Sequence, residues 1–374
     1  MKFSISSTSL LTHLQAISRV INSKNTLPIL DNFLFKIEGQ KLILTASDLE
    51  TTLITSVDLD SSEGEGVIAL SAKILLDTLK EFSDQPLTFD INDENLAMTI
   101  KSETGVYNFI GQNGDEYPKV PEMGEEVNSL VMPTSLLSSG INKTLFAAAE
   151  DELRPVMNGI FFDITTEDVT MVASDAHKLV RIKTNTVQGE TVCSFILPKK
   201  PTNMLKNILP KESGDVSIQF DIKNATFTLS NYKMICRLIE GRYPNYNSVI
   251  PQNNPYKAII DRVTLMNTLK RVSVFSNQAS NLVKLGFSEN EIDVSAQDID
   301  FSISAEEKLT CQYEGEAMKI GFKSSFLIDI LANIASTDVV IELADPSRAG
   351  LIFPFDNDPE EDTLMLIMPM MLND

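Results

Sequence analysis

Three aspartates recur at matching places along the chain, and carboxylates brought together in one site can do acid–base chemistry. Asp48, Asp175 and Asp298 each close the same pattern, Ala-x-Asp. A single aspartate that ends each of three repeats is also typical of a turn, because its side chain accepts hydrogen bonds from nearby backbone amides. We favour the turn role, and an enzyme stays open as an alternative that loss of activity in Asp175→Asn would support.

Other residues suited to catalysis or metal binding are few. His13 and His177 are the only histidines; we expect His13 on a helix surface, and neither a Gly-x-Ser-x-Gly elbow nor a P-loop occurs. Cys193, Cys236 and Cys311 are too widely spaced for a metal knuckle or a disulfide framework. No signal peptide and no apolar run near the roughly 20 residues of a membrane span is seen. We therefore expect no catalytic site, cofactor or metal, and a cytoplasmic protein.

Each aspartate ends a predicted β-hairpin. Apolar residues alternate with others on both sides of a short polar turn, which indicates two strands with one buried face. The same block occurs three times with the same spacing, at residues 33–48, 160–175 and 283–298. The inward-facing residues are Phe33, Phe35, Ile37, Leu42, Leu44 and Ala46, then Ile160, Phe162, Ile164, Val169, Met171 and Ala173, and last Val283, Leu285, Phe287, Ile292, Val294 and Ala296. The sequence therefore predicts three copies of one domain, with boundaries 1–125, 126–252 and 253–374.

Two helices are predicted in each copy, one before the hairpin and one after it. The windows are 8–24, 70–82, 134–149, 197–211, 260–275 and 320–334, and in the second of them Ile74, Leu75, Leu79 and Phe82 form an apolar stripe. These windows hold thirteen basic and four acidic residues, although the whole chain has a net charge of −21. The helices are thus basic and the remainder is acidic. Amphipathic helices with solvated lysines are the simpler explanation, but we favour one basic surface lined by helices.

A basic, helix-lined surface suggests a ring, if the repeats close on themselves. Helices pack about 8–10 Å apart, so six in a circle leave almost no hole. Twelve leave an opening of about 11–14 Å in radius, enough for a B-form duplex roughly 20 Å across. Such a ring would be a homodimer of three-repeat chains that holds DNA through its phosphates, without reading bases. An acidic protein-binding scaffold that does not encircle DNA is the other alternative.

Motifs along the whole chain resemble the bacterial DNA polymerase III β subunit family, the sliding clamps. They are Thr26-Leu27-Pro28-Ile29-Leu30, Ala46-Ser47-Asp48-Leu49-Glu50, Arg154-Pro155-Val156-Met157-Asn158-Gly159, Ser174-Asp175-Ala176-His177-Lys178-Leu179, Gly241-Arg242-Tyr243-Pro244 and Met368-Pro369-Met370. The resemblance implies an α+β fold of three clamp domains, with antiparallel sheets outside and two helices inside each domain. It implies a homodimeric ring that slides on duplex DNA and tethers the replicative polymerase. Clients and the clamp loader would bind through short hydrophobic peptides.

The resemblance and the helix charges also imply site residues. For DNA binding they are Arg19, Lys24, Lys143, Arg154, Lys199, Lys200 and Lys206. For the client-peptide groove they are Met157, Ser174, His177, Lys178, Leu179, Pro244, Val249, Ile367, Met368, Pro369, Met370 and Leu372. For the dimer interface they are Tyr107, Val274 and Phe275. The segment 364–372 could equally be a final core strand, and both roles can hold because alternate side chains face opposite ways.

Several positions depart from the family pattern. Ser248 and Met371 stand where arginine is common, so the groove is expected to be less basic and to prefer different clients. Pro155 and Val156 follow Arg154 where aromatic residues can occur, which argues against base stacking by this loop. Asn373 and Asp374 extend past the usual leucine ending.

Overall fold

The structure is a computed structural model that describes residues 1–151 and 153–372. Contacts divide the chain into two compact units, Met1–Ser135 with Asn203–Leu238 and Leu136–Thr202 with Ile239–Asp374. Two of the three divisions fall inside helices, α3 (Thr134–Thr144) and α4 (Lys199–Ile208), and the third lies between Leu238 and Ile239, outside any helix or strand. The predicted domain boundaries near 125 and 252 lie in segments without strands or helices.

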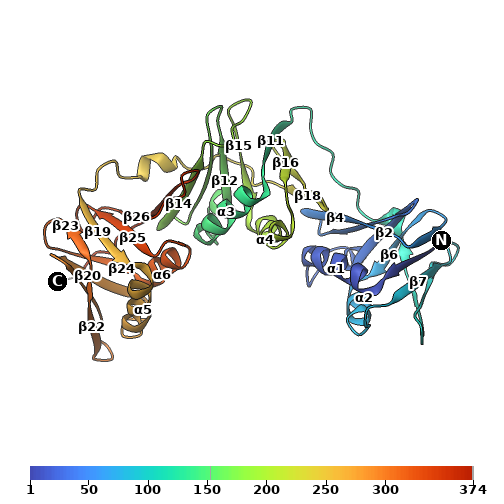
Figure 1. The fold of residues 1–374 in the computed structure, drawn as a ribbon, viewed down its shortest axis with the longest axis horizontal. Coiled ribbons are helices and arrows are strands. Elements are labelled where there is room, and N and C mark those ends of the chain that lie inside the picture. Colours follow the sequence, from blue (N-terminus) through green and yellow to red (C-terminus); the bar gives the residue numbers. More distant parts are fainter. Residues whose placement is uncertain (152, 373–374) are drawn as a thin grey trace. The chain divides into compact units, whose positions relative to one another are not determined.

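The first unit holds two antiparallel sheets and the helices α1 (Ser7–Ile17) and α2 (Ala72–Leu79), which pack against each other (Figure 1). The smaller sheet has the order β5-β1-β7-β8-β9, from β1 Lys2–Ser6, β5 Ser61–Glu63, β7 Pro86–Ile91, β8 Ala97–Lys101 and β9 Val106–Ile110. The larger sheet has the order β10-β6-β2-β3-β4-β18-β17-β16-β11, from β2 Asn32–Glu38, β3 Lys41–Ser47, β4 Thr51–Asp58, β6 Gly66–Ser71, β10 Gln112–Asn113, β11 Asn128–Pro133, β16 Asp215–Phe220, β17 Asn224–Thr228 and β18 Tyr232–Arg237.

The second unit is built in the same way, with α5 (Arg262–Ser273) packed against α6 (Ser324–Ala332) (Figure 1). Its larger sheet has the order β15-β12-β13-β14-β27-β26-β25-β19-β23, from β12 Gly159–Ile164, β13 Val169–Ser174, β14 Lys178–Thr184, β15 Cys193–Pro198, β19 Tyr256–Asp261, β23 Gln312–Glu314, β25 Asp338–Leu343, β26 Gly350–Pro354 and β27 Asp362–Ile367. Its smaller sheet has the order β22-β21-β20-β24, from β20 Leu282–Ser288, β21 Glu291–Asp298, β22 Ile303–Thr310 and β24 Met318–Lys323.

The three predicted hairpins are β2–β3, β12–β13 and β20–β21, and they share one register. Ile37 stands opposite Leu42, Ile164 opposite Val169, and Phe287 opposite Ile292. Every side chain predicted to face inward is buried, and the most exposed of them is Ala296 at 4%. The hairpins, their common turn length and the antiparallel α+β class are therefore confirmed.

All six predicted helices exist, but each is shorter than its window. Leu70, Leu197 and Ile320 belong to strands, because the apolar end of β6, β15 or β24 runs directly into the helix that follows. At α2 the change falls at Ser71, whose hydroxyl accepts a hydrogen bond from Ile74 N at 3.4 Å and so caps the helix. In the predicted stripe, Leu75 and Leu79 are buried whereas Ile74 is 47% exposed.

Short 3₁₀ turns complete the chain. They span Ser18–Val20, Pro28–Asp31, Gly114–Glu116, Leu145–Ala147, Pro155–Met157, Leu209–Lys211 and Tyr246–Val249. Because α1 ends at Ile17, Lys24 lies in a loop rather than on the predicted helix.

Two sheet ladders cross the predicted repeat boundaries. Strand β4 pairs with β18, and β14 pairs with β27. In each case the strand that follows a hairpin pairs with the last strand of the next repeat. We call these two pairings the first and the second junction.

Candidate functional site

The three recurring aspartates are turn residues, as predicted. In each, Oδ1 accepts backbone N–H groups two and three residues further along the chain. For Asp48 the distances are 3.0 and 2.6 Å, for Asp175 they are 2.9 and 2.8 Å, and for Asp298 they are 3.0 and 3.3 Å. Each carboxylate is thus occupied within its own turn, which argues against a shared acid–base site.

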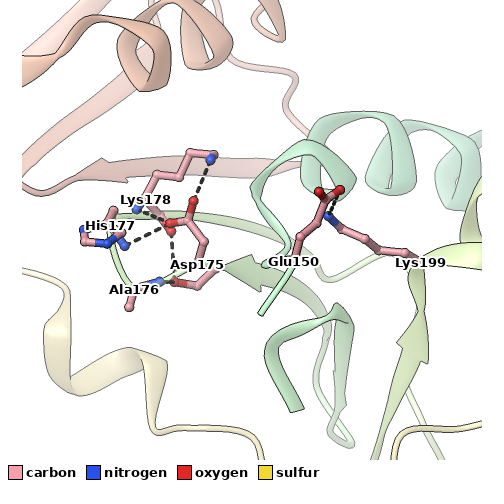
Figure 2. A network of polar contacts seen from close by, with 7 residues as sticks. Glu150, Asp175, Ala176, His177, Lys178 and Lys199 are labelled. Carbon is pink, nitrogen blue, oxygen red and sulfur yellow. Dashed lines mark hydrogen bonds and ion pairs between the residues drawn. The ribbon is translucent and has the colours of Figure 1, made fainter. Parts of the chain in front are cut away.

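The turn at Asp175 differs from the other two, because it holds a buried cation. Lys178 Nζ lies 2.6 Å from Asp175 Oδ2, with the lysine side chain only 7% exposed (Figure 2). The same Nζ lies 4.3 Å from the centre of the Phe326 ring, which adds a cation–π contact. Burial alone would raise the pKa of the Asp175 carboxyl, but the hydrogen bonds from Lys178 and the backbone outweigh it and hold that pKa below its ordinary value.

The chain beyond β27 packs against this turn. Met368 N donates to the carbonyl of His177 at 2.8 Å, and Met370 N donates to Gly321 O at 2.8 Å. The His177 ring stacks on Phe326 with 5.8 Å between centroids. The structure thus brings together His177, Lys178, Met368 and Met370 from the predicted groove.

Two neighbours of this cluster were missed at the sequence level. Phe326, in the first turn of α6, contacts both His177 and Lys178, and Lys323 Nζ lies 4.6 Å from the same ring. Their only sequence signal is an aromatic and a lysine at the start of an amphipathic helix, which an ordinary core helix also shows.

The other predicted groove residues are divided by burial. Met157, Ser174, Leu179 and Ile367 are buried, with Leu179 in a cluster that contains Tyr243 and Tyr246. Exposed or half-buried positions are Pro244, Val249, Pro369 and Leu372, with Val249 at 53% and Met368 at 40% exposure. Strand β27 confirms the final core strand predicted within 364–372. Asn373 and Asp374 lie outside the described residues.

Among the described residues, ion pairs are seen for Lys143, Arg154 and Lys199 of the predicted DNA-binding set. Lys199 Nζ lies 3.0 Å from Glu150 Oε1 and lowers the pKa of that carboxyl (Figure 2), and Arg154 Nε lies 2.9 Å from Asp151 Oδ2. Lys143 contacts Glu361, whose side chain is only 4% exposed. Arg19, Lys24 and Lys206 are exposed, and Lys200 is half-buried.

The three predicted interface residues are apolar and partly exposed. Val274 and Phe275 follow α5 and are 72% and 38% exposed. Tyr107 on β9 is 40% exposed and packs edge-on against Phe82. These two aromatic rings line a cavity of about 580 Å³ between α2 and the β8–β9 turn.

The surroundings of His13 and of the three cysteines indicate no catalytic or metal-binding role. His13 is half-buried rather than on the helix surface: its Nδ1 lies 2.9 Å from Thr55 Oγ1, and burial lowers its pKa. The three cysteines are free. Within residues 1–151 and 153–372, no group of His, Cys, Asp and Glu side chains could hold a metal ion. No helix in that part of the chain could cross a membrane.

Comparisons with known families cover nearly the whole chain. The models of the DNA polymerase III beta subunit match in three consecutive parts: the N-terminal domain at residues 1–121, the central domain at 131–245 and the C-terminal domain at 247–371. The chain belongs to this family. Its three repeats are therefore three clamp domains.

Individual relatives agree with this assignment. The chain is 30% identical over 375 residues to the beta sliding clamp of Haemophilus influenzae and 28% identical over 373 residues to that of Pseudomonas aeruginosa, and each alignment covers 100% of both chains. A crystal structure of the Pseudomonas aeruginosa sliding clamp bound to griselimycin matches with a TM-score of 0.94 at 27% identity, again over 100% of both chains. As a member of this family, the chain is a DNA sliding clamp, a processivity factor without catalytic activity of its own. The relatives support neither the enzyme nor the scaffold alternative.

Proposed function

We propose that two copies of this chain close into a ring around duplex DNA and tether the replicative polymerase to it. Clients and the clamp loader bind a groove on each copy through short hydrophobic peptides. We also propose a cytoplasmic location and the domain boundaries 1–125, 126–252 and 253–374. The observation that carries ring closure is the pairing pattern of the sheets.

The pattern leaves two strands without their partners. At both junctions the strand after a hairpin pairs with the last strand of the next repeat. The equivalent strand in the third repeat is β22. In the first repeat, β9 stands where β18 and β27 stand in the other two, because it ends the run β7-β8-β9 and only the two-residue β10 follows it. Strands β22 and β9 are both edge strands within their own sheets. If the pattern continues, β22 of one protomer pairs with β9 of the other, and two copies close a ring with no free end.

The ladders also supply a register for that contact. At the first junction, the row of paired residues that starts at Asn128 in β11 runs through Cys236 to Thr51. At the second junction, the row from Tyr256 in β19 runs through Ile367 to Lys178. Thr51 and Lys178 occupy the same place after their hairpins, so the two junctions share one register.

Applied to the third repeat, this register pairs two apolar residues. The row that starts at Met1 runs through Ile91 and Met98 to Phe109. The position equivalent to Thr51 and Lys178 is Ile303. The proposed interface therefore places Phe109 opposite Ile303 of the partner subunit. Val274 and Phe275 would enter the partner's cavity beside Tyr107, where burial of apolar surface stabilises the dimer.

The client-peptide groove is proposed at the turn from Asp175 to Lys178 and the chain beyond β27. Its residues are Met157, Ser174, His177, Lys178, Leu179, Pro244, Val249, Ile367, Met368, Pro369, Met370 and Leu372. Methionines adapt their shape to different side chains, which suits a surface with several partners. Ser248 and Met371 add no charge, so hydrophobic contacts dominate recognition.

DNA contact is proposed through Arg19, Lys24, Arg154, Lys199, Lys200 and Lys206, with Lys143 contributing least because Glu361 neutralises it. These contacts go to phosphates and read no sequence, as sliding requires. Pro155 opens a 3₁₀ turn after Arg154, so this loop offers a cation without an aromatic ring to stack on bases.

Retention on circular DNA tests the ring. The protein is loaded onto nicked circular duplex with a purified clamp loader, and part of the DNA is then linearised. We expect the protein to stay on circles and to leave linear DNA. Equal retention on both would mean direct backbone binding without encirclement. No retention on either, with a loader that works on a known clamp, would return weight to the scaffold alternative.

A further inference from the structure

An ion pair at the second junction joins a helix to the strand that completes the ladder. Lys143 is the tenth residue of α3, and it contacts Glu361, which stands six residues before Ile367. Ile367 is the residue opposite Lys178 in the junction register. Both residues of the ion pair can therefore be located by counting, Lys143 from the start of α3 and Glu361 from the paired residue Ile367.

The same two places at the open edges also hold a cation and a carboxylate. Helix α5 follows β19 as α3 follows β11, and its tenth residue is Arg271. Glu103 stands six residues before Phe109, the position equivalent to Ile367. At the first junction the equivalent residues are Ala16 and Ser230, so the charged pair is not a property of every repeat.

Both side chains remain able to form a further contact. Arg271 donates from Nε and Nη2 to Glu307 at 2.9 and 2.6 Å, and from Nη2 to Thr268 Oγ1 at 2.9 Å. Among the described residues, nothing accepts a hydrogen bond from Nη1 of Arg271, and no cation pairs with the exposed Glu103 carboxylate. A guanidinium has five N–H donors, so it can hold two carboxylates at once.

The charges around the two surfaces agree with such a contact. The last turn of α5 carries Lys270 and Arg271. The cavity beside Tyr107 is lined by two acidic residues, Asp77 and Glu81, and Glu103 follows on the adjoining β8–β9 turn. A basic helix end thus faces an acidic rim in the proposed dimer, which favours this pairing over other contacts between copies.

We infer that Arg271 of one protomer forms an ion pair with Glu103 of its partner, as the counterpart between protomers of the Lys143–Glu361 pair. This inference rests on the proposed closure of β22 on β9. Arg271 would then sit between Glu307 of its own chain and the partner's Glu103. Because these groups lie at the rim and not in the core of the interface, the contact makes dimer affinity depend on salt.

Charge reversal in the full-length chain tests the pair. We expect Glu103→Arg and Arg271→Glu each to raise the dimer dissociation constant about tenfold or more at about 50 mM salt, and the double variant to return to within about threefold of the original. Sedimentation velocity over a dilution series measures the constant. The effect should shrink at about 500 mM salt, where charges are screened within a few ångströms. Circular dichroism checks folding, and Glu103→Gln serves if a reversal variant unfolds.

A matched control and an interface variant separate the possible failures. Glu94→Arg makes the same charge change on the turn at the other end of β8, and it should leave the constant within about twofold. If Glu103→Arg changes no more than this control, or if the double variant shows no recovery, the ion pair is wrong. If Phe275→Arg also leaves the dimer intact, the proposed interface itself is wrong.

Discussion

The second junction and the edges of β9 and β22 have the same arrangement of strands. At the junction the two strands pair within one chain, whereas β9 and β22 have no such pairing within the described residues of a single chain. At the junction, Leu364 to Ile367 on β27 are at most 5% exposed, and Glu361 is buried against Lys143. At the open edges, Val106 and Ile110 on β9 are 61% and 75% exposed. The same arrangement of strands and charges is thus found once buried and once open.

The difference indicates what the open edges are for. An edge strand with exposed apolar side chains favours pairing with another chain, and proteins normally protect such edges with charges or proline. Strand β9 carries neither within Val106–Ile110. Its composition is that of a strand with a partner, and the proposed closure supplies β22 of a second copy as that partner.

The largest expected effect comes from placing a charge inside the proposed interface. Phe275→Arg should raise the dimer dissociation constant more than about a hundredfold, because a guanidinium would have to lose its water among apolar groups. Light scattering across a dilution series measures this. Phe355→Arg is the matched control, since Phe355 is 49% exposed and lies outside the proposed contact. If the Phe275→Arg protein stayed dimeric, the open edges would not form the dimer interface as proposed.

The second effect compares equivalent positions inside the chain. Lys143→Met should destabilise the junction by about 3 kcal/mol, because Glu361 would stay buried without its cation. Arg271→Met should cost the monomer much less, since Arg271 is exposed and solvent weakens its pair with Glu307. Hydrogen exchange of the β27 and β22 amides measures both.

A paired replacement controls for packing in this comparison. Lys143→Met combined with Glu361→Leu should recover most of the lost protection, because no charge is then left buried. Equal losses of protection in Lys143→Met and Arg271→Met would contradict the distinction between a buried junction and an open edge.

Local pattern was enough to predict the repeats but not how they join. Alternation within residues 33–48 depends only on which side chains a strand buries, so the hairpins could be found in the sequence. The pairing of Thr51 with Cys236 joins residues far apart in the chain, and no local pattern encodes it. Local pattern also misplaced several helix starts. The apolar end of a buried strand and the first turn of a helix have similar sequences, so the point of change between them could not be found.

The contact partners of charged and aromatic side chains could not be predicted from the sequence either. The helical windows indicated that Lys143 is basic, but not that a buried carboxylate neutralises it. Phe326 lies in the predicted helical window 320–334, but its contacts with His177 and Lys178 depend on how the second and third repeats pack. Positions of the aspartate turns needed no such information, because Asp48, Asp175 and Asp298 bind amides of the next few residues.

Asp175 should contribute less to the free energy of unfolding than the buried Lys143–Glu361 pair does, but more than the equivalent turn residue Asp48. Asp175→Asn removes the charged partner of Lys178 and should cost about 2 kcal/mol near neutral pH. Asp48→Asn should cost about 1 kcal/mol, because it disturbs the backbone hydrogen bonds of its turn and the bond from Asn22 Nδ2. Because folding lowers the pKa of Asp175, its contribution is present above the ordinary value of 3.8 and is lost as the pH falls through the folded value.

Urea unfolding at several pH values tests this prediction. The difference in unfolding free energy between the original protein and Asp175→Asn should be constant well above pH 3.8 and should close as the pH falls below 3.8. A gap that grew on acidification would contradict the direction of the pKa shift.

The smallest expected effect is on the salt dependence of DNA affinity. It should differ between a basic residue at the junction, Lys143, and one outside it, Lys206. Lys206 is exposed on α4, so Lys206→Ala should remove one phosphate contact and lower the slope of log affinity against log salt by about one unit. Lys143 is already neutralised by Glu361, so Lys143→Met with Glu361→Leu removes no net charge and should leave the slope unchanged. Anisotropy of a labelled linear duplex, titrated at several salt concentrations, measures the slope. If both variants lowered it equally, Lys143 would reach DNA in spite of its partner, and the junction pair would be a DNA contact as well as a structural one.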